Sequence, residues 1–324
     1  MGRFQKPILL SVILAIGLYL GAMFLGDFRE TQAAIKQVGF SGWSIILGLS
    51  LVNYLLRFWR WEWYLFKLSQ VHIPKFRHLL YYFCGFALST TPGKAGETIR
   101  SLYLKPHGIG YSKTISTFFV ERFQDLLTIV LMSGAAAILF DGYRVVIIIT
   151  GILALCCLPL LHNRKVIKVI LNFADRSPEK VSALLKQLVE LLNSSAVLLK
   201  NRELLGGILL GLVAWLAEAV GFWYLLLLLG QDVNLLAAVS IYGVAVLIGA
   251  ISFLPGGLGS TEAVMGLLLI SIGVPQPVAI AATLICRIAT LWFAVFIGLT
   301  TAGSLAVLGV TPIANSEFSE KGGK

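Results

Sequence analysis

Two proline-glycine breaks interrupt apolar stretches about half the chain apart. They occupy residues 91–97 (TPGKAGE) and 254–262 (LPGGLGSTE), and each ends in a glutamate. In both halves an arginine lies 25 residues after that glutamate, and a polar residue lies 44 before it. These are Arg122 and Asn53 around Glu97, and Arg287 and Glu218 around Glu262. A broken, charged apolar segment that occurs twice is typical of a membrane transporter with its site between two repeats.

The composition indicates that lipid must cover this chain. Of its 324 residues, 57% are hydrophobic and 13% charged, so a soluble domain could not bury the apolar surface. Long windows such as 233–261 and 288–316 contain no charged residue. They favour helices over a barrel, whose strands would be short and alternating. The net charge of +10 comes from basic residues in short loops beside spans, so we expect no nucleic-acid partner.

The sequence therefore predicts an all-α integral membrane protein with about six spanning helices and two re-entrant, broken-helix hairpins. The predicted spans are about 8–25, 43–56 and somewhat beyond, 114–140, 145–161, 204–229 and 278–308. This layout puts 19 of the 26 lysines and arginines on one side and 3 on the other. By the positive-inside rule, that asymmetry places both termini in the cytoplasm.

The hairpins define an inverted internal repeat. Segment 79–91 has 13 residues and rises about 20 Å as a helix, too little to cross a ~30 Å hydrocarbon core. It fits one arm of a hairpin that enters from the cytoplasm, and 95–104 fits the other. The second hairpin, 235–272, would enter from outside, although its 20-residue first arm could also cross completely.

These elements predict one polytopic domain over residues 1–310, with a flexible cytoplasmic tail at 311–324. Repeat one would cover about 43–140 and repeat two about 208–305. Between them, 163–202 has an apolar stripe on one helical face, and Ser177-Pro178 resembles a helix start. We interpret it as an amphipathic helix on the inner leaflet, although a helix packed against the protein is the alternative.

Charged side chains inside these segments are the candidate site residues. Each costs at least about 2.5–3.5 kcal/mol at mid-depth unless it is paired or faces water. The candidate binding residues are Lys94, Glu97, Arg100, Arg122, Asp125, Glu218, Glu262 and Arg287. The structural alternative is simple ion pairing that locks helices together, such as Glu97 with Arg122 and Glu262 with Arg287.

The breaks themselves suggest an anion site. Proline stops a helix and glycine permits a tight turn, so the next helix presents its positive N-terminal end. The candidate break residues are Pro92, Gly93, Gly96, Pro255, Gly256, Gly257 and Gly259. Arginines could add bidentate contacts to phosphate, and the glutamates could orient them, bind an amine or carry a proton. The alternative role for the glycines is close helix packing.

The sequence shows no pattern that indicates catalysis, metal binding or a cofactor. We expect no catalytic residues, no metal site and no cofactor, because no triad, ligand cluster or nucleotide loop is evident. Transport without a nucleotide motif would be downhill or driven by an ion gradient. Trp59, Trp61, Trp63 and Tyr64 lie beside Arg57 and Arg60 in a basic stretch after the second span. They predict an interfacial aromatic belt or, alternatively, a surface for lipid headgroups.

These motifs in combination resemble one family, the lysylphosphatidylglycerol synthetase-type transmembrane domains. The resemblance covers residues 5–305 and rests on 56–61 (LRFWRW), the two breaks, Arg100 with Tyr103-Leu104, and Glu121-Arg122 with Asp125. It implies a bacterial or archaeal plasma-membrane protein that moves or handles an anionic lipid. The chain is expected to lack the family's synthase domain, and so not to be an enzyme.

The leading hypothesis is therefore a flippase or scramblase for an anionic phospholipid or a polyprenyl-phosphate-type lipid. The headgroup would bind between the hairpins. The alternatives are an accessory protein or transferase of a polyprenol or hopanoid lipid pathway, and a permease for a small anion. Membrane lipids are the expected partners, and a homo-oligomer or association with lipid-biosynthesis enzymes is compatible with the sequence.

Overall fold

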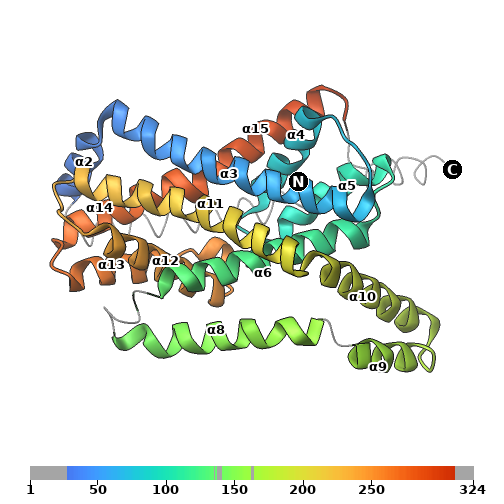
Figure 1. Cartoon of the computed structure of the whole chain (residues 1–324). Helices are drawn as coiled ribbons and strands as arrows, with labels where there is room; N and C mark the ends of the chain where they lie inside the picture. Colours follow the sequence, from blue (N-terminus) through green and yellow to red (C-terminus); the bar gives the residue numbers. More distant parts are fainter. Residues whose placement is uncertain (1–27, 135, 137–140, 162–163, 311–324) are drawn as a thin grey trace.

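The computed structural model describes residues 28–134, 136, 141–161 and 164–310, and every regular element in those ranges is helical (Figure 1). The expected all-α fold is thus confirmed. Four helical stretches are long and apolar enough to cross a membrane: α3 (Gly39–Ser69), Val181–Leu198 within α10, α11 (Asn201–Leu228) and Gln276–Val307. The predicted span 8–25 and the tail 311–324 lie outside the described residues. A total of six spans stays a prediction.

Helix α3 is much longer than expected. It has 31 residues, whereas the sequence predicted a span ending near residue 56 and a basic loop after it. The prediction was wrong because Arg57 and Arg60, which were assigned to this basic loop, lie on one helical face and are buried, as described below. A second difference is α2 (Phe28–Gln37), a helix where an outer loop was expected. Both segments are therefore more helical than charge counting suggested.

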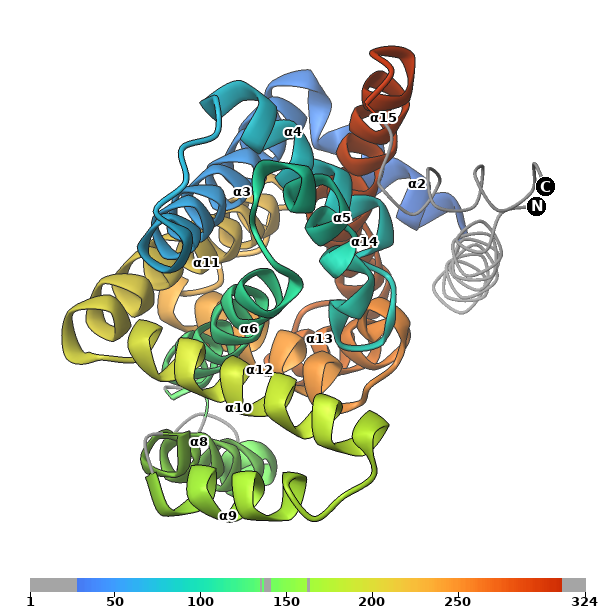
Figure 2. The same cartoon turned by 90° about the vertical axis from the view of Figure 1, so that its right-hand side faces the viewer.

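The two long helices α3 and α11 pack side by side in opposite directions (Figure 1). Gln37, just before α3, donates a hydrogen bond of 2.9 Å to the carbonyl of Leu228 at the end of α11. At the other end, Lys67 lies 3.0 Å from Glu203 in the first turn of α11. Helix α6 (Tyr111–Ser133) packs against both of them and against α12 (Leu235–Ile251). Figure 2 shows these helices gathered in one bundle.

Each break joins short helices in the middle of this bundle. Helix α4 (Lys75–Gly85) and a 3₁₀ turn (Phe86–Leu88) lead into a 3₁₀ segment (Pro92–Ile99), followed by α5 (Arg100–Leu104). Helix α12 leads through a 3₁₀ turn (Pro255–Gly257) into α13 (Ser260–Ser271). At 17 residues, or about 25 Å, α12 is shorter than the hydrocarbon core. The break segments touch each other, since a Cβ on Gly256 would lie 3.4 Å from the Cα of Thr90.

The last predicted span is one continuous helical stretch with an irregular centre. Helix α14 (Gln276–Arg287) continues through a π-helical turn (Ile288–Trp292) into α15 (Phe293–Val307). The π turn begins directly after Arg287, the charged residue of this stretch. Such turns occur frequently at functional sites because they redirect side chains within a helix.

The segment between the halves differs in detail from the prediction. Instead of one helix over 163–202, it forms α9 (Arg164–Ala174) and α10 (Glu179–Leu198), which pack together (Figure 2). Pro178 explains the interruption, since it disfavours helical backbone in the residue before it. Ser177 does not cap α10, as its hydroxyl donates instead to the carbonyl of Phe173.

We expect α9 and α10 to lie at the membrane surface. Val169, Phe173 and Leu184 expose more than 60% of their surface beside the exposed Lys168 and Lys186. An apolar face bordered by cations is typical of an interfacial helix. A fluorophore at Leu184 should be shielded from a water-soluble quencher in vesicles, and one at Lys186 should not. Equal shielding at both positions would favour a spanning α10 instead.

Candidate functional site

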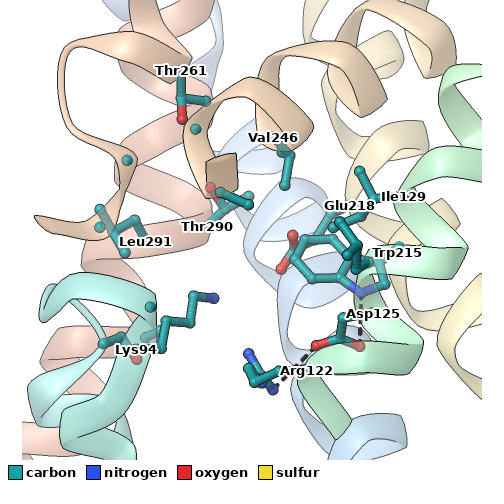
Figure 3. A pocket seen from close by; sticks show the side chains of 18 of the residues that line it. Lys94, Arg122, Asp125, Ile129, Trp215, Glu218, Val246, Thr261, Thr290 and Leu291 are labelled. Carbon is teal, nitrogen blue, oxygen red and sulfur yellow. Dashed lines mark hydrogen bonds and ion pairs between the residues drawn. The ribbon is translucent and has the colours of Figure 1, made fainter. Parts of the chain in front are cut away.

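A cavity of about 440 Å³ lies where the two breaks meet. Its walls come from α3, α6, α11, α12, the two breaks and the start of the π turn. Five of the eight predicted binding residues line it: Lys94, Arg122, Asp125, Glu218 and Arg287. Figure 3 shows Lys94 reaching from the first break toward Arg122 and Asp125 on α6. The structure thus brings together charges that are 193 positions apart in sequence, on elements of both halves.

The other three predicted residues are not among the cavity-lining residues. Glu97 and Arg100 are fully buried and pair at 2.9 Å, and Glu97 also accepts a hydrogen bond of 2.9 Å from the Ser89 hydroxyl. The alternative that Glu97 pairs with Arg122 is therefore wrong, since Arg122 pairs with Asp125 at 3.1 Å. The reason is local: Arg100 lies three positions after Glu97, which places the two side chains on the same side of one helical turn. This pair fixes the shape of the first break.

The second break is held by the pair that the sequence predicted. The Arg287 Nε donates to Glu262 at 2.7 Å, and its Nη2 donates to the carbonyl of Gly256 at 2.6 Å. The other carboxylate oxygen of Glu262 accepts from the backbone amide of Gly259 at 2.7 Å. Glu262 and Arg287 together close the break, while Arg287 also lines the cavity.

Three of the seven predicted break residues line the cavity, and the other four do not. Gly93, Gly256 and Gly257 line the cavity, and all three have positive φ angles that other residues rarely adopt. Pro92, Gly96, Pro255 and Gly259 are not among its lining residues. Gly96 instead packs closely, since a Cβ there would collide with Leu88 and Thr91. Lys94 has a φ of 56°, which is unusual for a lysine and directs its side chain from the tip of the break.

Sequence reasoning missed two arginines of the site, Arg57 and Arg60, which it placed in a cytoplasmic loop. Both are buried on α3, with exposed fractions of 3% and 0%. Arg60 donates to Asp125 at 2.5 Å, and Arg57 lines the cavity. The missed signal is their spacing: residues 53, 57, 60 and 64 carry polar groups at intervals of four, three and four, which is one face of a helix.

The prediction of an interfacial aromatic belt is also wrong for two of its four residues, Trp61 and Tyr64. Trp61 and Tyr64 are fully buried, whereas Trp59 is 59% exposed. Trp61 donates to His78 at 3.0 Å, and Tyr64 donates to Gln124 at 2.8 Å. A tryptophan-rich basic stretch therefore forms helix packing here, because its residues alternate between the lipid-facing and core-facing sides of α3.

Trp215 lines the cavity and contacts three of its charged residues. Its indole nitrogen donates to Asp125 at 3.1 Å, and its ring lies 5.7 Å from the Arg57 guanidinium and 5.8 Å from the Lys94 ammonium (Figure 3). Cations over a tryptophan face are attracted by the ring quadrupole. Arg57 nevertheless keeps unused donors, since its Nε and Nη2 are buried and have no hydrogen-bond partner in the described part of the chain.

The cavity has both charged and apolar lining residues. Arg57, Lys94 and Arg122 are among the charged ones, and Leu126, Ile129 and Val246 are among the apolar ones. Its edge includes Ile251, Phe253 and Leu254, which expose 41%, 72% and 45% of their surface. An apolar, exposed edge connects the cavity to the outer surface of the bundle. The cavity therefore joins charged side chains to an exposed apolar edge.

The fold and site define a polytopic membrane protein with a cationic cavity between two broken helical segments. The family model of the lysylphosphatidylglycerol synthase transmembrane region matches residues 8–298, and the chain belongs to this family. The chain is 22% identical over 319 residues to a UPF0104 membrane protein of Pyrococcus horikoshii, covering 89% of this chain and 94% of that one. A UPF0104 protein of Methanothermobacter thermautotrophicus is 27% identical over 237 residues, 66% of this chain and 69% of the relative.

Proposed function

We propose that the protein is a flippase or scramblase, without enzymatic activity, that moves an anionic lipid between leaflets. The observation that carries the proposal is the cavity itself, where cations lie beside the two breaks and an apolar edge is exposed at the surface of the bundle. The lipid phosphate would lie near Arg57, Lys94 and Arg122. Its tails would leave past Phe253 and stay in the membrane.

Alternating access follows from the arrangement of the two halves. The long helices α3 and α11 run in opposite directions, and each is followed by a shorter helix that ends at a break. An inverted repeat of this kind lets one half rock against the other around a central site. In this mechanism the two touching breaks separate first toward one leaflet and then toward the other. The re-entrant geometry of both hairpins and the cytoplasmic position of the termini belong to the same proposal.

Leaflet exchange in vesicles tests this function. Purified protein, reconstituted with fluorescent phosphatidylglycerol, should make most of the inner-leaflet label accessible to dithionite, which bleaches only the outer leaflet in protein-free vesicles. Arg122→Ala and Arg287→Ala should each slow the exchange, because each removes a cationic side chain from the cavity wall where the headgroup would bind. Lys186→Ala on the exposed part of α10 is the matched control.

Two results would favour a function other than lipid exchange. A requirement for a sugar or aminoacyl donor before any lipid is altered would support a transferase or an accessory subunit. Uptake of a water-soluble anion without lipid exchange would support a permease. Wild-type exchange rates in both arginine variants would contradict the proposed site.

A further inference from the structure

Glu218 differs from the neighbouring carboxylates in what lies next to it. It lines the cavity from α11, and 6% of its surface is exposed. Four other carboxylates in or near the cavity wall each have an arginine nitrogen within 4.0 Å: Glu97, Glu121, Asp125 and Glu262. Among the described residues, Glu218 has no lysine or arginine nitrogen within that distance. It therefore lacks the close countercharge that favours the ionised form of the other four.

Tyr242 and several more distant cations surround Glu218. The Tyr242 hydroxyl on α12 donates to Oε2 of Glu218 at 2.5 Å, and both side chains line the cavity. Helix α11 also packs against α3, α6 and α14. The other titratable or charged groups that face Glu218 or share its cavity are Tyr54 and Arg57 on α3, Arg122 and Asp125 on α6, Cys286 and Arg287 on α14, and Lys94 from the first break. The cations of this set act on Glu218 from beyond 4.0 Å.

Glu218 is therefore under two opposing influences. Burial favours its neutral carboxyl form, whereas the hydrogen bond from Tyr242 and the distant cations favour the carboxylate. No close ion pair holds it in one form, and its place in the cavity wall gives it access to whatever enters there (Figure 3). Glu97 and Glu262, the proton carriers that the sequence suggested, are instead paired with arginines at 2.9 and 2.7 Å. Glu218 is the better placed of the three to gain and lose a proton.

We propose that Glu218 binds the proton that drives transport, so that one proton crosses the membrane with each anionic headgroup. This inference rests on the proposed function. An ionised Glu218 repels an anion in the cavity and competes with it for the field of Arg57 and Lys94. Protonation removes that negative charge, so the proton and the anion bind cooperatively. By linkage each raises the affinity for the other by the same factor.

The proton cycle needs no further reactant. Water on the acidic side supplies the proton to a Glu218 carboxylate oxygen while an anionic headgroup enters the cavity. The proton and the headgroup leave together on the other side, and Glu218 returns as a carboxylate that accepts from Tyr242. For a headgroup with one negative charge, the movement is electroneutral. A pH gradient therefore sets the final distribution of the lipid between leaflets.

That distribution can be measured in vesicles of the full-length protein with fluorescent phosphatidylglycerol. When the interior is more acidic by about one pH unit, the label should accumulate about tenfold in the outer leaflet, because each proton carries one anion outward. Dithionite, added after chilling to slow exchange, should then bleach about nine tenths of the label instead of about half. Nigericin in potassium buffer dissipates the gradient and should restore the equal distribution. Protein-free vesicles under the same gradient give the background.

Glu218→Gln tests the assignment of the proton to this residue. Glutamine stays neutral, and its amide oxygen can still accept from Tyr242. The loaded form can therefore cross, but the gradient should no longer shift the label from an equal distribution. The readout is the final distribution, so a changed rate does not affect it. Glu190→Gln, on the exposed side of α10, is the matched control and should respond to the gradient as the wild type does.

Tyr242→Phe provides a second, independent variant. Without a gradient, exchange by the wild type should fall as the pH rises, because the ionised Glu218 opposes the anion. Removing the Tyr242 hydroxyl takes away a hydrogen bond that stabilises the carboxylate. The pH midpoint of exchange should therefore move upward in this variant. A purely structural role of the tyrosine would change the rate without moving the midpoint.

The outcomes separate the proton site from the proposed function. Wild-type exchange that leaves the label equally distributed under the gradient would overturn the coupling and leave lipid transport intact. A Glu218→Gln protein that follows the gradient, or that is folded but exchanges no lipid, would overturn the role of Glu218. If this variant does not fold, an unshifted midpoint in Tyr242→Phe overturns it instead. Absence of any exchange by the wild type would overturn the proposed function, and the coupling with it.

Discussion

Replacing Arg57 with methionine should reduce lipid exchange by at least about thirtyfold while leaving the protein folded. Truncating one partner of a buried, hydrogen-bonded charge contact costs about 2–5 kcal/mol of binding, and 1.4 kcal/mol corresponds to a factor of ten. Methionine keeps an unbranched apolar stem between Phe86 and Trp215, whose rings lie 5.8 and 5.7 Å from the Arg57 guanidinium. Exchange of fluorescent phosphatidylglycerol in vesicles, measured with dithionite, gives the rate.

The melting temperature of the same variant distinguishes loss of function from loss of structure. Among the described residues, the Nε and Nη2 of Arg57 are buried without a hydrogen-bond partner, so the lipid-free fold gains little from this guanidinium. We therefore expect the melting temperature of Arg57→Met in detergent to equal or exceed that of the wild type. Arg57→Lys, which keeps the charge but loses the forked donors, should fall between the two in exchange rate. A folded Arg57→Met protein with wild-type exchange would refute the role of this residue.

The breaks and their partners could be predicted from the sequence because they depend on local rules. Proline and glycine chemistry located both breaks, and the recurring distance of 25 residues identified the contact between Glu262 and Arg287. Five of the eight predicted binding residues line one cavity, and local features of the sequence identify each of them. Each lies in or near a break, or in an apolar helix where an ionised side chain must face a polar space.

The arginines of α3 could not be placed correctly by charge counting. The positive-inside rule treats a basic stretch as a loop, and 56–61 contains two arginines among three aromatic residues. The acidic face of α6 compensates much of the cost of their burial: Asp125 accepts from Arg60 and lies 3.9 Å from Arg57. That compensation is a long-range contact between residues 65 positions apart, and no local pattern reveals it. The pairing of Glu97 with Arg100 is instead a local contact between residues three positions apart. It was missed because the repeated spacing of 25 residues indicated Arg122 as the partner.

A second large effect concerns the packing that holds the first break. Gly298 on α15 lies directly against the backbone of the 3₁₀ turn Phe86–Leu88, and a Cβ at this position would collide with backbone atoms of Phe86 and Ala87. Backbone cannot move aside as a flexible side chain can. Gly298→Ala should therefore destabilise the protein by about 3 kcal/mol, the upper end for overpacked cores. The readout is the melting temperature in detergent.

Gly303 on the same helix provides the matched control. It is exposed, and a Cβ there would have no atom within 4 Å, so Gly303→Ala should be neutral or stabilising by up to about 1 kcal/mol. Gly298→Ala should also slow lipid exchange in any protein that remains folded. The displaced turn carries Phe86, which lies against Arg57, and leads directly to Ser89, which holds Glu97. Equal melting temperatures for the two alanine variants would mean that α15 can move away from the turn, and that the first break is not held in place by this contact.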